Sequence, residues 1–541
     1  MSNHKEGTFI KNAFILSAAA IISKILGAFY QAFLYQTVGA GGVGIYMKGI
    51  NFYAMLLAIS AAGIPIAISK LMSEERAAGR DDVANRIFSY SLKLLFFIGL
   101  FLSIGLFFFA PIIAKNIFAD SRTTYVLQAM APALFVVTVM SAFRGYFQGK
   151  QQMLPTGISQ VFEQIARVGF SVAITIFILN NFIGNNSLRI INGVAFGPFV
   201  GAVLALIVLL LFFKNKGESV VLLKSNKKEN LKILKRIILF AMPVTLAALL
   251  PTFLDVIEGI IIPIRLMANG FSLDAADKLY GSFSGAVLAL VNLIVSTSSA
   301  FAISIVPAIS AAIGRNDKKE LARKVKLSIK MVNFISVPAG FGLLFLGRPI
   351  LDLIFNAGDA YSILQFSFIM VLFIGLYHNT TGILQGMGKT FIPIISLSIG
   401  LLVNVVVLTI LISFNSLNIL AAPIAYTLTY MVASSINYIA IKKSIYFKSD
   451  WYIWFPRVVI SGLITGFMAL LSYKLFFMIF FGLFGYSVSQ LISLVLCVLV
   501  AFVVYVIVLV ATRGISRNEA MAIPKFSKIV IKVFDKLKIE S

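Results

Sequence analysis

Charged side chains lie within long apolar stretches of this chain, where an isolated charge is costly in a bilayer. Lys24 is the clearest case, because it lies in the middle of an apolar run that begins near residue 9. Asp255 and Glu258 are three residues apart, so a helix would place them on one face. Charges inside a membrane normally face water or a partner. We therefore expect Lys24 to hold an anion. The two carboxylates are expected either to hold a cation or a proton, or to balance lysines across a cavity.

Four more basic residues and one more carboxylate extend this pattern. Glu163 and Arg167 are four residues apart and predict a pair on one helical face that neutralises itself. Lys48 and Lys278 lie near the ends of apolar segments, where a lysine either reaches the lipid headgroups or adds to a cationic cavity. Arg144 opens the polar segment RGYFQGKQQMLP between two apolar runs. Together these residues predict recognition of an anionic group inside a membrane.

The elements that must position these side chains are membrane-spanning helices. Hydrophobic residues make up 59% of the chain and charged residues only 12%, against roughly 25% charged in soluble domains. Apolar runs long enough to cross a hydrocarbon core of about 30 Å recur along nearly the whole sequence. The sequence therefore predicts an all-α polytopic membrane protein with about fourteen transmembrane helices. The predicted spans are 9–37, 43–70, 87–110, 124–147, 156–180, 189–213, 235–263, 280–311, 328–355, 361–386, 390–414, 417–441, 455–480 and 485–512.

An internal repeat divides these spans into two halves. The segment RGYFQGKQQMLP at 144–155 has a counterpart, TGILQGMGKTFIP, at 381–393, about 237 residues later. A second pair of similar segments begins at Pro65 and Pro307. Each half starts after an even number of crossings, which predicts two parallel six-helix lobes related by an axis normal to the membrane. The last two helices are an addition to this core.

The repeat predicts five regions. The predicted regions are an N-terminal six-helix lobe (1–213), a basic cytoplasmic linker (214–234), a C-terminal six-helix lobe (235–446), two further helices (447–512) and a basic cytoplasmic tail (513–541).

The distribution of basic residues predicts the orientation. The chain carries a net charge of +25, and most of its 46 Lys and Arg lie at the N-terminus, in the connections after even-numbered spans, and in the tail. Short loops rich in Lys and Arg stay cytoplasmic, so both termini are expected inside a cell membrane. The basic clusters predict contact with anionic membrane lipids and no nucleic-acid binding. No catalytic or metal-binding motif and only one cysteine, Cys497, are present, so we expect neither an enzyme nor a cofactor.

Several motifs resemble one family of transporters. They are RGYFQGKQQMLPTGISQVFEQIARV at 144–168, SKILGAFYQ at 23–31, VGAGGVGIY at 38–46 and GIPIAISKL at 63–71. The chain resembles the polysaccharide-flippase branch of the multidrug/oligosaccharidyl-lipid/polysaccharide exporters. The most similar groups are the stage V sporulation protein B group and the MurJ-type lipid II flippases. The resemblance implies two six-helix lobes in a V, a lipid-facing groove made by two further helices, and a central cationic cavity that carries the diphosphate of lipid II.

The resemblance also implies roles for single residues. Lys24 matches a cavity arginine of the family, and Lys278 matches the arginine of its D-R-L motif. Three positions depart from the family. Tyr30 stands where the family has a second arginine, Gly281 stands where it has an acidic residue, and residues 52–57 lack an arginine that the family has.

The sequence thus predicts a transporter that flips a lipid-linked cell-wall precursor, lipid II, from the inner to the outer leaflet. The predicted substrate-binding residues are Lys24, Lys48, Lys278, Arg144 and Arg167, and the predicted coupling-ion residues are Asp255 and Glu258. Coupling to the membrane potential, Na+ or H+, and contact with the cell-wall synthesis machinery, are further expectations. The alternatives are a flippase for another undecaprenyl-linked polysaccharide unit, a multidrug cation antiporter, and a membrane protein of envelope assembly that transports nothing.

Overall fold

The computed structural model describes all residues except 1, 185, 216–226, 446–449, 522–526 and 538–541. The described residues form helices and connecting turns, without a strand. They pack into two compact units, unit 1 (residues 1–281) and unit 2 (residues 282–541). Parts of the predicted linker at 214–234 and of the predicted tail at 513–541 lie outside the described residues.

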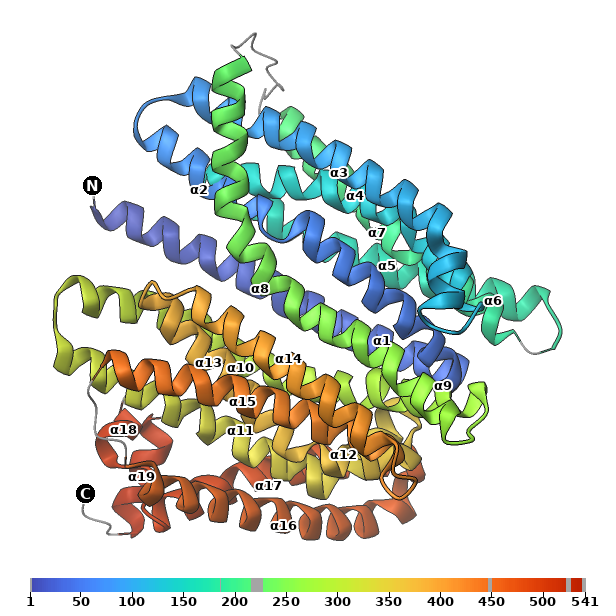
Figure 1. Cartoon of the computed structure of the whole chain (residues 1–541). Helices are drawn as coiled ribbons and strands as arrows, with labels where there is room; N and C mark the ends of the chain where they lie inside the picture. Colours follow the sequence, from blue (N-terminus) through green and yellow to red (C-terminus); the bar gives the residue numbers. More distant parts are fainter. Residues whose placement is uncertain (1, 185, 216–226, 446–449, 522–526, 538–541) are drawn as a thin grey trace. The chain divides into compact units, whose positions relative to one another are not determined.

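Helices account for nearly all of each unit (Figure 1). Those of unit 1 are α1 (Ser2–Ala61), α2 (Ile64–Ala77), α3 (Asp81–Asn116), α4 (Thr123–Gly149), α5 (Met153–Asn181), α6 (Ser187–Val194), α7 (Gly197–Asn215), α8 (Lys227–Ala268) and α9 (Leu273–Gly281). Those of unit 2 are the π-helical turn η1 (Ser282–Val287), α10 (Leu288–Gly314), α11 (Lys318–Phe355), η2 (Gly358–Ala360), α12 (Tyr361–Phe366), α13 (Phe368–Gly386), α14 (Phe391–Ile412), η3 (Asn418–Leu420), α15 (Ala421–Ser444), α16 (Trp451–Phe484), α17 (Tyr486–Ala511), α18 (Arg517–Met521) and α19 (Ser527–Leu537).

The number of membrane crossings in the structure agrees with the fourteen spans predicted from the sequence. In the described part of the chain, 13 helices are long and apolar enough to cross a membrane, and one of them is a 60-residue stretch, Ala18–Ala77. A helix of that length would measure about 90 Å, roughly three times a bilayer core. The stretch bends at Gly39, whose φ of 71° lies in the region that favours glycine. Counting it as two crossings gives fourteen, and the predicted all-α membrane fold is confirmed.

The repeated glycine motif of the first half packs α4 against α2. A Cβ atom on Gly145 would lie 2.8 Å from the carbonyl oxygen of Pro65, and one on Gly149 would lie 3.3 Å from that of Ser69. The Ser73 hydroxyl donates a hydrogen bond to the Gly149 carbonyl at 2.8 Å. Two glycines four residues apart thus allow the helix backbones to touch, as small residues do between membrane helices.

The motif of the second half repeats each of these contacts between α13 and α10. A Cβ atom on Gly382 would lie 2.5 Å from the Ala302 carbonyl oxygen, and one on Gly386 would lie 2.9 Å from that of Val306. The Ser310 hydroxyl donates to the Gly386 carbonyl at 3.0 Å. All five residues lie 237 positions after their counterparts in the first half, so the packing pairs Pro65 with Ala302 and not with Pro307. The internal repeat is therefore present in the packing as well as in the sequence.

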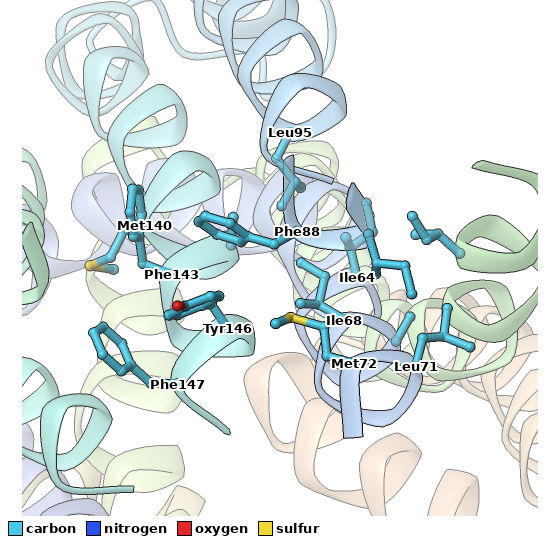
Figure 2. Packing of buried hydrophobic residues seen from close by; sticks show 14 of the residues in the cluster. Ile64, Ile68, Leu71, Met72, Phe88, Leu95, Met140, Phe143, Tyr146 and Phe147 are labelled. Atoms are coloured by element: carbon cyan, nitrogen blue, oxygen red, sulfur yellow. The ribbon is translucent and has the colours of Figure 1, made fainter. Parts of the chain in front are cut away.

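Aromatic side chains surround the first copy of the motif (Figure 2). The Phe88 ring of α3 lies 5.5 Å from that of Phe143 and 4.6 Å from that of Tyr146, measured between centroids. Both partners belong to α4 and flank Arg144. Offset and edge-to-face pairs of this kind fix the rotation of a helix about its axis. This core therefore determines which way the Arg144 end of α4 faces.

Helices α8 and α9 pack within unit 1, although the repeat assigns them to the second half of the chain. A Cβ atom on Gly281 would collide with the Ala40 carbonyl oxygen, and one on Gly44 would collide with that of Asp277. Backbone contact of α1 with α9 thus leaves no room for the acidic side chain that the family has at position 281. The region boundaries drawn from the repeat stay predictions.

Candidate functional site

Three cationic side chains of unit 1 come from α1, α4 and α5. Lys24 is exposed on α1 and has no ion-pair partner among the described residues. Its neighbour Ser23 donates a hydrogen bond to the Gln160 carbonyl at 3.4 Å, so α5 lies beside α1 at this level. Gln160 and Arg167 are seven residues apart on α5, which places them on the same face of that helix.

Arg144 is the cation that already has a carboxylate partner. Its Nη2 donates to Glu163 Oε2 at 2.7 Å, and its Nε donates to the Ser159 hydroxyl at 3.1 Å. The sequence pattern predicts instead that Glu163 pairs with Arg167, and that prediction is wrong. Ion pairs four residues apart on one helix are weak, and α4 brings Arg144 close enough to take the carboxylate.

Arg167 lies among tyrosines and has no carboxylate partner among the residues that the structure describes. Its Nη2 donates to the Tyr46 hydroxyl at 3.1 Å, and its guanidinium lies 5.1 Å from the centroid of the Tyr30 ring. Its buried Nε has no hydrogen-bond partner in the described structure. Tyr30 stands where the family has an arginine. The guanidinium of Arg167 lies beside this position and supplies a similar positive charge there. A buried N–H of a cation without an acceptor is a strong site for an anion.

These residues leave unit 1 with a surplus of positive charge. Arg144 pairs with Glu163, whereas no ion pair involves Lys24 or Arg167 among the described residues, which leaves these two positive charges uncompensated. An apolar cavity of about 310 Å³ lies between α1 and α5, and none of the three cations lines it. Its lining includes Ile22, but residues two apart on a helix point to nearly opposite sides, so Lys24 faces away from this cavity.

Lys48 lies in a separate cluster of buried ions that the sequence did not predict. Its side chain is fully buried, and its Nζ lies 3.0 Å from Asp120 Oδ2 and 2.5 Å from Asp277 Oδ1. Arg122 Nε donates to Asp120 Oδ1 at 2.8 Å, and Nη1 donates to Asp274 Oδ1 at 2.6 Å. Arg122 Nη2 donates to Asp277 Oδ2. Two carboxylates thus neutralise the charge of Lys48, so this lysine is not available to an anionic ligand in this structure.

Neighbouring charges favour the ionised forms of Asp120 and Arg122. Burial alone would raise the pKa of Asp120, but hydrogen bonds from Arg122 and the charge of Lys48 outweigh burial and hold that pKa below its usual value. Burial would lower the pKa of Arg122, and the neighbouring carboxylates raise it instead. A carboxyl with a lowered pKa stabilises the folded state above its unfolded pKa and loses that contribution only as the pH falls through the folded value.

The structure separates Lys278 from Lys24. Lys278 is exposed on α9, and α9 contacts α1 at residues 40 to 44. These residues lie about 24 to 30 Å along α1 from Lys24, at 1.5 Å per residue. The two lysines that match arginines of the family therefore do not meet in this structure.

Asp255 and Glu258 lie on α8, as predicted, and are not equally accessible. The Glu258 side chain is buried, with 1% exposed, whereas Asp255 is half-buried. Each takes part in an interaction with other groups of the protein. Next to Glu258, Gly259 allows close approach of the Tyr280 hydroxyl, since a Cβ there would lie 2.9 Å from it. This packing fixes the α8 segment against α9.

A profile of the family described as "Polysaccharide biosynthesis protein" matches residues 9–313, which is more than half of the chain. The chain belongs to the polysaccharide biosynthesis protein family. A MatE profile matches residues 282–410 as well.

Relatives of this polysaccharide biosynthesis protein include two from Bacillus subtilis (strain 168). The chain is 27% identical to the lipid II flippase MurJ over 454 residues, 80% of this chain and 82% of the relative. It is 26% identical to stage V sporulation protein B over 538 residues, 97% of this chain and 99% of the relative. The solved structure of a lipid II flippase MurJ in an inward closed conformation superposes with a TM-score of 0.67 at 16% identity, over 92% of this chain and 99% of that one.

These similarities confirm the predicted resemblance to the flippase group of the exporter superfamily. This member of the polysaccharide biosynthesis protein family is a multi-pass membrane transporter of the plasma membrane, and the relative MurJ is a flippase by name. The structural match at 16% identity establishes the fold alone.

Proposed function

We propose that this protein flips lipid II from the inner to the outer leaflet by alternating access, for peptidoglycan synthesis. The observation that carries the proposal is the uncompensated positive charge of unit 1. There Lys24 has no ion-pair partner and Arg167 Nε has no acceptor among the described residues. The oxygens of a diphosphate accept hydrogen bonds from both groups. The similarity to a protein named as a lipid II flippase supports this choice of substrate.

The lipid part of such a substrate needs an apolar surface near the cations. The cavity between α1 and α5 offers an apolar surface on the same two helices as Lys24 and Arg167, although neither cation lines it. A transporter of this kind needs no catalytic group or cofactor. Its other partners would be the anionic lipids that the basic loops attract, and contact with the cell-wall synthesis machinery stays a prediction.

A second candidate substrate is another undecaprenyl-linked polysaccharide unit. The family description favours it, because it names polysaccharide biosynthesis without a particular sugar. The MatE profile match raises drug export as a third function. Cationic drugs require carboxylates, and the group in unit 1 offers cations. A membrane protein of envelope assembly that transports nothing would leave the partnerless Arg167 N–H without a role.

The test is a flipping assay with defined lipids. The purified full-length chain is reconstituted in vesicles that contain either lipid II or an undecaprenyl diphosphate with a different sugar, and the flipped headgroup is labelled from the opposite side. Faster flipping of lipid II than of the second lipid is the expected result. Equal rates would favour the broader polysaccharide function, and no flipping of either lipid would remove the proposal. Rescue of cells depleted of their own lipid II flippase is the corresponding test in vivo.

We propose that Asp255 and Glu258 bind the coupling ion, Na+ or H+. Replacing both residues (Asp255→Asn with Glu258→Gln) is expected to slow flipping and to weaken its dependence on an ion gradient or the membrane potential. Binding of lipid II should stay nearly unchanged, and the exposed Asp81→Asn substitution serves as the control. Tighter lipid II binding in the double variant would instead mean that the carboxylates balance cavity cations, because removal of negative charge strengthens attraction for an anion.

We also propose that both termini face the cytoplasm, as the distribution of basic residues predicts. Single cysteines at Lys318 and Asn415, both exposed, report on the two sides of unit 2. Cys497→Ser gives the background, because the Cys497 thiol donates to the Leu494 carbonyl and a hydroxyl can do the same. Position 318 should react with a membrane-impermeant maleimide only after the cells are opened, and position 415 in intact cells. The reverse pattern would invert the orientation.

A further inference from the structure

Unit 2 contains a second cavity that is independent of the proposed transport site. It has a volume of about 410 Å³ and lies between α11, α13, α15 and the start of α16. Helix α17 contributes no residue to its lining. The cavity therefore differs from a groove built by the last two membrane helices, and it shares no residue with the cationic group of unit 1.

One residue that lines this cavity carries a buried polar atom without a partner among the described residues. Asn333 lines the cavity and is 2% exposed. Its amide nitrogen donates to the Ile329 carbonyl at 2.7 Å, whereas its Oδ1 has no hydrogen-bond partner among the described residues. A buried amide oxygen is stable only with a donor nearby, so this position calls for a ligand with a hydroxyl or N–H group, or for a water.

The charges around the cavity cancel. At the outer end, Lys326 forms an ion pair with Asp450. Lys330 lies 5.6 Å from the centroid of the Trp454 ring and pairs with Glu519 at 2.5 Å. Two cations thus face two carboxylates. A ligand with a net charge would disturb one of these pairs, so the cavity favours an uncharged molecule.

The walls of the cavity are apolar and aromatic. Phe373 and Trp454 line it, and Trp451 lies at its outer end, 56% exposed. Lys326 and Asn333 are seven residues apart on α11, which corresponds to about 10 Å of depth. We propose that this cavity binds an uncharged long-chain alcohol of the membrane, with its hydroxyl group donating to Asn333 Oδ1 and its chain along the aromatic wall.

Tryptophan fluorescence reports on this cavity alone, because the chain has two tryptophans and both line it. The full-length protein is reconstituted in phosphatidylcholine vesicles and titrated with 11-bromoundecan-1-ol or with 1-bromoundecane, whose bromine quenches tryptophan. We expect saturable quenching by both probes. The alcohol should bind about three- to tenfold more tightly, the difference that one neutral hydrogen bond makes.

Asn333→Leu removes the acceptor at similar volume and should reduce the affinity for the alcohol to that for the bromoalkane. Asn404→Leu is the matched control, since Asn404 is a buried asparagine of α14 outside the cavity, and it should keep the difference. Leu372→Phe reduces the volume of the cavity and leaves Asn333 unchanged. It should weaken the binding of both probes. Quenching that rises without saturation, or that is unaffected by Leu372→Phe, would show partition into the bilayer and overturn the proposal. Equal affinity for alcohol and bromoalkane in the unmodified protein would overturn it too, because the amide oxygen would then have water as its partner.

Discussion

Lys24→Ala is expected to reduce flipping of lipid II by about 10- to 100-fold at a normal level of folded protein. The reason is that Lys24 is exposed on α1 with no ion-pair partner among the described residues, so its charge is available to the substrate. A hydrogen bond to a charged group contributes about 1.5–3 kcal/mol. Lys24→Arg should keep much of the activity, since it retains the charge. Initial rates in reconstituted vesicles give the measurement.

Lys115→Ala is the matched control for this prediction, because Lys115 is an exposed lysine at the end of α3. It should flip lipid II at the normal rate. Binding of lipid II to the purified Lys24→Ala protein should weaken together with transport. Normal rates in the alanine variant would remove Lys24 from the mechanism, and with it half of the charge surplus on which the proposed function rests.

Lys48→Met is expected to destabilise the protein by about 3–5 kcal/mol, the usual cost of removing one partner from a buried ion pair. The Lys48 side chain is fully buried, and its loss leaves Asp120 and Asp277 with Arg122 as their remaining cation. Unfolding of the detergent-solubilised protein, followed by denaturant titration, provides the free energy. Lys115→Met should change it by less than about 0.5 kcal/mol.

A double substitution separates lost charge balance from lost packing. Lys48→Met combined with Asp277→Asn restores the net charge of the cluster and should recover part of the stability, so the two effects should not add. If Lys48→Met unfolds like the unmodified protein but binds lipid II more weakly, then Lys48 contacts the substrate as the sequence pattern predicts, and its burial here belongs to one conformation of the transporter.

The ion cluster lies beyond the reach of sequence patterns. Asp120 and Arg122 lie in the connection between α3 and α4, and Asp277 lies on α9, so 155 positions separate Arg122 from Asp277. Connections after odd-numbered spans reach the same side of the membrane, and this rule could have suggested that these charges meet. The rule could not have predicted which of these charges form ion pairs. A list of spans does not say which helices are neighbours in the fold.

Packing between helices also explains why Glu163 pairs with Arg144 instead of Arg167. Spacing on one helix favours Arg167, but α4 approaches α5 closely enough for Arg144 to take the carboxylate at 2.7 Å. The consequence for the site is large, since it leaves the Nε of Arg167 without an acceptor. A local rule worth a few tenths of a kcal/mol is easily outweighed by a contact between helices.

The sequence by itself determined the membrane-spanning helices, their approximate bounds and the two-fold repeat. Apolar length and glycine spacing act locally, and hydrocarbon requires each span to satisfy its own backbone hydrogen bonds. Gly145 and Gly382 can therefore be matched from the order of residues alone. Which charges remain free was decided by the tertiary structure alone. Lys48 forms ion pairs with two carboxylates from distant segments, whereas Lys24 has no carboxylate partner in the part of the chain that the structure describes. In a medium of low dielectric the function of a charge depends on its nearest partner, and that partner is chosen by packing.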